Sequence, residues 1–319
     1  MNLIKNELIK IFKRPNIYLL IVIGILIMTC YNIFQKITSL DVDVIQQYQR
    51  AHDSDKLLIE NYNRTNSIEN YGNIIERVKL EEYAIENNIT YNILLNSENK
   101  NAPIPTDARI LLMKVFNNFD IIIIFIIIYL CSTIISEEYN TGTIKYLLIK
   151  PHSRTKILLS KILSSIIVSI LIVFSIVIFQ YLFGGILFGF DSYKLDAIRY
   201  NSYTQTIENI NLINYMIMIT LAKTPMYLLL NIICLLFGTI INNIALNILL
   251  TLGLYIISTI KILVNKISKY IFIYNWDISN YLFNSTILVK TSLIISAINL
   301  LLIFVLLVVN FKNKDIKNI

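Results

Sequence analysis

The chain has 319 residues, of which 55% are hydrophobic and only 15% charged, with a formal net charge of +7. The apolar residues form long continuous blocks, which is typical of a polytopic membrane protein and excludes an ordinary soluble domain. No Gly is followed by Lys, so the sequence has no phosphate-binding P-loop, and the two histidines and three cysteines show no metal-ligand spacing. We therefore expect no enzyme activity, catalytic residue, metal site, cofactor site or nucleic-acid partner in this chain.

Six apolar blocks have about the length that a helix needs to cross a bilayer. Their apolar cores lie at 17–34, 116–135, 162–183, 226–241, 244–263 and 293–309. The sequence therefore predicts an all-α integral membrane protein with six transmembrane helices. Including flanking residues, these helices fall within 16–38, 115–136, 162–183, 224–263 for the fourth and fifth together, and 292–319 for the sixth with the C-terminal tail.

Residues 1–15 predict an amphipathic helix in the membrane interface, because Leu, Ile and Phe recur at helical spacing with Lys between them. A basic flank that only sets topology is the alternative. Pro15 lets the chain turn into the membrane. No small-residue cleavage site follows the first apolar block, so we expect this block to be retained as a span.

The distribution of Lys and Arg predicts the orientation. With the N-terminus in the cytosol, 1–15, 137–161 and the C-terminal tail carry an excess of basic residues, whereas 39–114 carries an excess of acidic ones. Both termini are therefore expected to be cytosolic. Four lysines disagree with this topology, since they would lie outside: Lys261, Lys266, Lys269 and Lys290.

Three segments are expected outside the membrane. The loop 39–114 is too long for a simple connector, and heptad-like spacing within it predicts helices that form a small cap; the residues are Tyr71, Ile75, Val78, Ile85 and Ile89. Within 184–223, Lys223 and Pro225 predict a break before the fourth helix, with the earlier part interfacial or re-entrant. The third external loop is 264–291.

The segment 137–161, EEYNTGTIKYLLIKPHSRTKILLSK, is a charged, turn-rich stretch between the second and third spans. Thr141 and Gly142 can start a short helix, which Pro151 would end. Its apolar side consists of Ile144, Leu147 and Leu148. Because so short a helix is marginal in water, it needs a groove on a partner or on the membrane. The basic residues of this segment can pair with acidic groups of a partner or with anionic lipid. They are Lys145, Lys150, Arg154 and Lys156.

This segment resembles the coupling region of the membrane-spanning (permease) subunit of type-2 ABC transporters. The matching pattern is EYxxGTxKxLLxxPxSR, which comprises Glu138, Tyr139, Gly142, Thr143, Lys145, Leu147, Leu148, Pro151, Ser153 and Arg154, with Lys161 after it. The amphipathic N-terminal segment and FKNKDI at 311–316 are further similar features. The resemblance implies that these residues form a cytosolic coupling helix that docks on a separate ATPase.

The resemblance also implies a function and partners. The chain would be the permease subunit of an exporter in the bacterial cytoplasmic membrane, paired with a second copy or a related permease. An ABC ATP-binding subunit would bind ATP and Mg²⁺. An apolar and aromatic lining suggests an amphipathic cargo, such as a peptide, drug or lipid-like molecule, as in antimicrobial peptide resistance.

Asp120 and Asn231 are polar residues within predicted spans, but their positions do not single them out as substrate ligands.

A different class of protein fits the same features. The chain could be a non-transporting membrane sensor or immunity protein whose external cap binds a ligand. A stable complex with an ATPase distinguishes the two classes, because only the transporter requires one.

Overall fold

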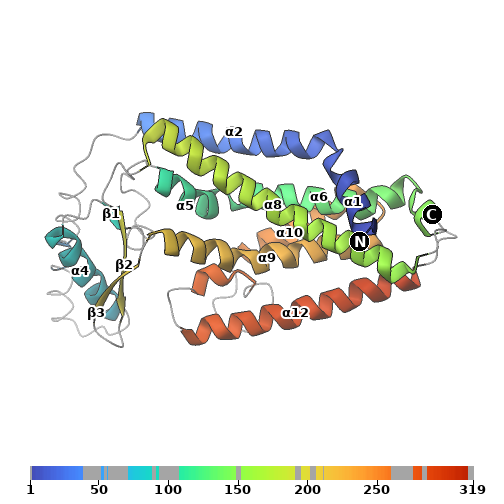
Figure 1. Cartoon of the computed structure of the whole chain (residues 1–319). Coiled ribbons are helices and arrows are strands. Elements are labelled where there is room, and N and C mark those ends of the chain that lie inside the picture. Colours follow the sequence, from blue (N-terminus) through green and yellow to red (C-terminus); the bar gives the residue numbers. More distant parts are fainter. Residues whose placement is uncertain are drawn as a thin grey trace. The chain divides into compact units, whose positions relative to one another are not determined.

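The computed structural model describes residues 2–38, 52–53, 56, 71–87, 91–92, 108–148, 152–190, 195–201, 206–210, 212–259, 276–281 and 286–314. This part of the chain is mostly helical (Figure 1). It divides into two compact units. Unit 1 comprises Met1–Ile27, Phe116–Ile178 and Ile219–Ile319, and unit 2 comprises Met28–Val115 and Phe179–Met218.

Five helices in the described part are long and apolar enough to cross a membrane. They are α2 (Pro15–Thr38), α6 (Asp120–Asn140), α8 (Arg154–Phe188), α9 (Leu212–Ile240) and α12 (Thr286–Asn313). The shorter apolar helix α10 (Ile244–Thr259) lies where the fifth span is predicted, and the remainder of that span, 260–263, is outside the described residues. The prediction of a helical, multi-pass membrane protein is thus confirmed.

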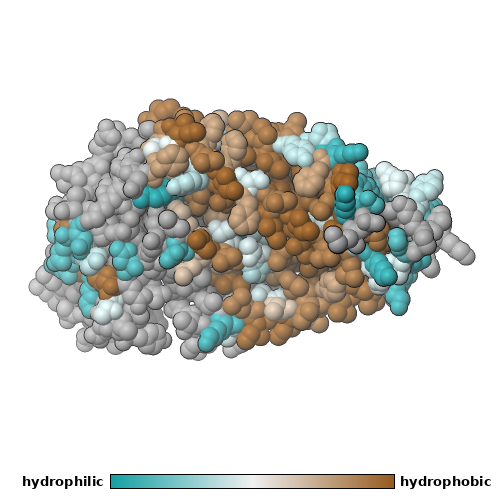
Figure 2. Space-filling view, viewed as in Figure 1, coloured by the Kyte–Doolittle hydropathy of each residue, from teal (hydrophilic) through white to brown (hydrophobic). Residues whose placement is uncertain are grey.

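Helix α6 is the central element of unit 1. Its apolar window is 72% buried, against 17% for α12, so α12 lies at the periphery. Helix α10 packs along α6, and α12 packs against the short 3-10 helix η2 (Ile278–Tyr281). Large apolar side chains cover the exposed sides of the long helices, as Figure 2 shows. Such a surface is suited to contact with lipid tails or with another membrane protein.

Both described chain ends lie at one end of unit 1 (Figure 1). Helix α1 (Asn2–Phe12) contacts the C-terminal end of α6 through Lys10 and Glu138, and Lys314, just after α12, contacts Tyr139 at the same place.

Helix α9 contradicts the predicted break at Lys223 and Pro225, because it continues through Pro225 as one helix. Proline lacks the N–H that would normally bond the carbonyl of Leu221. Here the Thr224 hydroxyl donates to that carbonyl at 2.7 Å. The lost backbone bond is therefore replaced locally, and 212–223 is continuous with the predicted fourth span.

Unit 2 contains a small sheet that the sequence did not predict. Strands β2 (Leu195–Asn201) and β3 (Thr206–Ile210) pair antiparallel, with Arg199 opposite Glu208. Strand β1 (Tyr91–Asn92) pairs parallel to β2, and α4 (Tyr71–Glu86) packs on β2. The predicted helix at Tyr71–Ile85 is present as α4, and the two-residue strand β1 also lies within 39–114. Most of the remainder of that loop lies outside the described residues.

Two further helices complete the fold. Helix α5 (Ala108–Asn118) precedes α6, and Phe119 separates them, so the second span begins at Asp120 and not within 115–119. Asp120 lies in the first turn of α6, where a negative charge complements the helix dipole. Helix α7 (Ile144–Leu148) lies between α6 and α8.

The Thr224 hydroxyl is expected to stabilise α9 specifically because Pro225 follows it. Replacing Thr224 by Val should lower the free energy of unfolding by about 1–2 kcal/mol. The loss should be clearly smaller in a Pro225→Ala background, because the backbone N–H at position 225 can then donate to the Leu221 carbonyl. Thr239→Val is the matched control, since the Thr239 hydroxyl bonds the Leu236 carbonyl in the same way but Ile240 has its own N–H. Denaturant unfolding in mixed micelles measures these values. If Thr224→Val lowers the free energy of unfolding equally with and without Pro225→Ala, the hydroxyl does not compensate for the proline.

Candidate functional site

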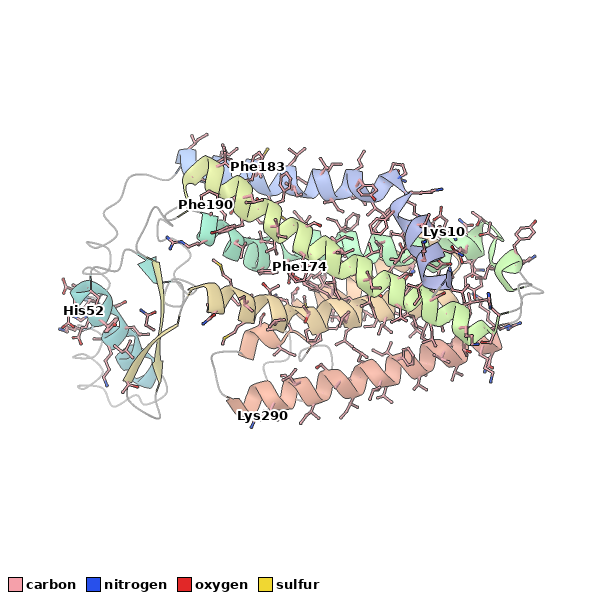
Figure 3. The ribbon with its side chains drawn as sticks, viewed as in Figure 1. Lys10, His52, Phe174, Phe183, Phe190 and Lys290 are labelled. Carbon is pink, nitrogen blue, oxygen red and sulfur yellow. The ribbon has the colours of Figure 1, made fainter. Side chains whose placement is uncertain are left out.

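A buried ion network joins three helices of unit 1. We call it the Glu138 network; its members are Glu7 and Lys10 of α1, Glu138 of α6 and Lys161 of α8. The Lys161 ammonium lies 2.7 Å from Glu138 Oε2 and 3.2 Å from Glu7 Oε2. Lys10, which is labelled in Figure 3, pairs with Glu138 Oε1. Helices that are distant in sequence are therefore joined through one carboxylate.

The network is balanced in charge, with two acids and two bases. Lys161 is fully buried and Glu138 is 2% exposed. An isolated charge in this position would be very costly, so the partners must stay together for the fold to persist. A second, more exposed ion pair, Arg14 with Glu137 at 2.9 Å, joins the start of α2 to the same turn of α6.

The segment that follows α6 is a tight turn and a short helix. The Thr141 N–H and hydroxyl both donate to the Glu137 carbonyl, and Gly142 adopts a φ of 68°, which closes α6. Thr141 and Gly142 therefore end α6, and the Gly142 carbonyl also accepts from the Lys145 N–H at 3.2 Å, where α7 begins. The predicted short helix itself is present as α7.

Helix α7 has one anchored side and one exposed side. Ile144 is completely buried, whereas Lys145 and Tyr146 are exposed, Tyr146 by 74%. A large aromatic side chain this exposed is typical of a contact surface. We call residues 141–153 the α7 segment.

Arg154, the first residue of α8 directly after the α7 segment, contacts the C-terminal end of α12. Arg154 Nη1 donates to the carbonyls of Lys312 and Lys314, at 2.8 and 3.2 Å. The Lys314 ammonium lies over the Tyr139 ring, 3.9 Å from its centroid, and donates to the Asn242 side chain. Partial burial lowers the pKa of the Lys314 amino group, an effect that these two contacts oppose by stabilising the cation.

The ten residues of the predicted coupling pattern thus divide by environment. Glu138 and Tyr139 are buried and hold the base of the α7 segment, and Arg154 holds its other end. Gly142, Thr143 and Ser153 lie at the turns, and Lys145 is at the exposed surface. Leu147 and Leu148 belong to α7, while the packing of their side chains and Pro151 lie outside what the structure describes.

A second buried cluster lies at the other end of α6. Lys223 of α9 donates to Asp120 Oδ2 and to Asp277 Oδ2, both at 2.8 Å. Tyr227 donates to the other Asp120 oxygen, and Ser279 donates its N–H and its hydroxyl to Asp277. This Lys223 triad (Asp120, Lys223 and Asp277) fastens α6, α9 and the residues around η2 together.

The two charged clusters lie on either side of one apolar stretch. Asp120 and Glu138 are separated by about 27 Å along α6 at 1.5 Å per residue. This distance is close to the roughly 30 Å of a hydrocarbon core. A bilayer centred on this stretch would place one cluster near each interface, where charges are less costly than at the bilayer centre.

A family model described as "Protein of unknown function (DUF2705)" matches residues 95–317, which is more than half of the chain. The chain belongs to the DUF2705 family. No curated protein and no solved structure matches it. The matched DUF2705 region includes α6–α12, and therefore Glu138, Lys161 and the Lys223 triad, whereas α1 with Glu7 and Lys10 lies before it.

Polar side chains between the two clusters of this DUF2705 protein are hydrogen-bonded to one another. Asn231 accepts from Ser165 and donates to Ser169, each at 2.9 Å. Asn247 donates to the Ser136 hydroxyl at 2.9 Å and to the Cys234 carbonyl at 3.1 Å. These hydrogen bonds join α9 to α8 and α10 to α6 and α9.

Removing Glu138 should destabilise the protein much more than removing its neighbour. Glu138→Gln leaves Lys161 with Glu7 as its only acidic partner among the described residues, and should lower the free energy of unfolding by about 3 kcal/mol. Glu137→Gln is the matched control; its exposed pair with Arg14 should contribute no more than about 1 kcal/mol. Unfolding in mixed micelles measures both. Similar losses for the two variants would show that the buried network has no special role in stability.

Proposed function

We propose that this chain is the permease subunit of an ATP-driven ABC exporter and that the α7 segment receives work from a separate ATP-binding subunit. One observation carries the proposal. The α7 segment exposes Lys145 and Tyr146 at its tip while buried or charged contacts hold both of its ends. A segment with an exposed tip and a fixed base is suited to transmit displacement into the helices.

The contacts suggest how such a displacement would spread. Glu138 connects the base of the segment to α8 through Lys161 and to α1 through Lys10. Arg154 connects its other end to α12. A loose loop would absorb a push by changing its backbone angles, whereas a segment held at both ends moves the attached helices with it. The transport cycle would then follow from the motion of α1, α6, α8 and α12.

The partner surface is proposed to be an acidic groove. Lys145 is next to Tyr146 in the sequence, and both it and Lys156 in the first turn of α8 are exposed. An apolar slot for the Tyr146 ring with carboxylates at its rim would complement this surface. ATP and Mg²⁺ would be bound by that partner. A second copy or a related permease would complete the substrate path in the bacterial cytoplasmic membrane, with both termini in the cytosol. The cargo is proposed to be amphipathic.

The pairing with an ATPase is tested on the full-length chain expressed in its native host. We expect an ATP-binding subunit to co-purify and its ATP hydrolysis to remain with the complex. Tyr146→Ser combined with Lys145→Glu should reduce the associated ATPase activity by about tenfold or more, because an exposed aromatic and its neighbouring charge are typical binding determinants.

Lys290→Glu is the control, since Lys290 is an exposed lysine of α12 outside the α7 segment. It should leave the associated activity unchanged. Absence of any ATPase from the purified protein would favour the sensor or immunity alternative. An ATPase that stays bound and active despite both α7 changes would overturn the role given to this segment.

A further inference from the structure

Two buried amide side chains of unit 2 each have an atom without a hydrogen-bond partner. Asn32 of α2 is 2% exposed and Gln180 of α8 is 1% exposed. Oδ1 of Asn32 and Nε2 of Gln180 are buried and unpaired. In the part of the chain that the structure describes, the other buried side-chain atoms without a hydrogen bond belong to residues that form ion pairs. These two amides are therefore the exceptions among the neutral side chains.

Both amides lie toward the C-terminal ends of their helices. On α8, Gln180 and Gly184 are one turn apart on the same buried side. This side faces α5, since a Cβ on Gly184 would lie 2.8 Å from Leu111 Cδ1. Asn32 likewise lies on a buried side of α2, one turn after the completely buried Met28. The C-terminal ends of α2 and α8 and most of α5 belong to unit 2 (Figure 1).

Each buried amide has exposed apolar neighbours in the sequence. Ile33, next to Asn32, is exposed. Phe179, next to Gln180, is exposed and stacks on the exposed Phe183, with ring centroids 5.7 Å apart. Figure 3 labels Phe183 near the end of α8. These surroundings favour a ligand that enters from the lipid over one that enters from water.

Joining helices does not explain the two amides. Asn231 and Asn247 join helices, and their amides are paired with other polar groups of the protein. An unpaired buried amide lowers stability, because it has lost its hydrogen bonds to water and gained none in return. A group that is retained at such a cost is explained when a bound molecule supplies the missing partner.

We propose that Asn32 and Gln180 bind the backbone of an apolar peptide within the membrane. A peptide group has one N–H and one carbonyl, so it can donate to Asn32 Oδ1 and accept from Gln180 Nε2. A lipid ester offers acceptors alone, and a charged group would be costly beside uncharged amides in apolar surroundings. The inference names the cargo of the proposed exporter and in that respect rests on the proposed function. Peptide binding itself requires no ATPase.

Peptide binding to the full chain in phosphatidylcholine nanodiscs, without ATP or a partner subunit, tests the proposal. The probe is a fluorescent, amidated hexapeptide of alternating leucine and alanine. We expect saturable binding that is weakened about tenfold by Asn32→Leu and by Gln180→Met, since each variant keeps a similar volume but loses one hydrogen bond. The same peptide with esters in place of its amides lacks the N–H groups and should also bind about tenfold more weakly to the unmodified protein.

Three results would overturn the proposal: no saturable binding, equal affinity for the amide and ester probes, or undiminished affinity in both variants. Absence of an ATPase from the purified chain, with peptide binding intact, would instead contradict only the exporter. The two proposals can therefore fail separately.

Unfolding in mixed micelles without peptide separates a binding role from a structural one. Asn32→Leu and Gln180→Met should each shift the unfolding midpoint to higher denaturant concentration, because each removes an unpaired buried amide. Asn231→Leu is the matched control and should shift it to lower concentration, since it removes the hydrogen bonds to Ser165 and Ser169. A lower midpoint for both Asn32→Leu and Gln180→Met would give these amides a structural role and contradict the proposal.

Discussion

The buried pair of Glu138 and Lys161 is the constraint on which the rest of unit 1 depends. A fully buried ammonium next to long apolar helices is stable only with carboxylates in contact with it, and these come from α6 and α1. Once the pair forms, the end of α6, the first turns of α8 and the N-terminal helix are fixed together. The α7 segment then has a defined base, which a turn of this length would not have by itself.

At the other end of α6, the Lys223 triad likewise stabilises a buried lysine by contact with carboxylates. Lys223 and Pro225 each disfavour a helix within a membrane, one by its charge and the other by its missing N–H. Asp120 and Asp277 neutralise the charge, and Thr224 satisfies the free carbonyl. These carboxylates and the Thr224 hydroxyl explain why α9 remains continuous although its sequence indicates an interruption.

The sequence could predict features that depend on local patterns, but not contacts between residues that are distant in the chain. Long apolar runs predicted five of the candidate spans, because backbone hydrogen bonds in lipid must be made within each helix. The α7 helix followed from local turn residues. The partners of Asp120 and Lys161 could not be predicted, since Lys223 and Glu7 lie more than a hundred residues away in the chain. The hairpin of β2 and β3 was missed because its strands are short and follow a long apolar helix, where a membrane-associated segment was the expected continuation.

A distance distribution tests whether the Glu138 network holds α7 in one position relative to α1. Spin labels at positions 146 and 5, both exposed, would report the separation of α7 from α1 in the full chain in lipid by pulsed electron paramagnetic resonance. We expect a single narrow distribution, and a markedly broader one when Lys161→Met removes the central ammonium. A distribution that is already broad in the unmodified protein, or one that stays narrow without Lys161, would contradict the view that this ion network fixes the segment.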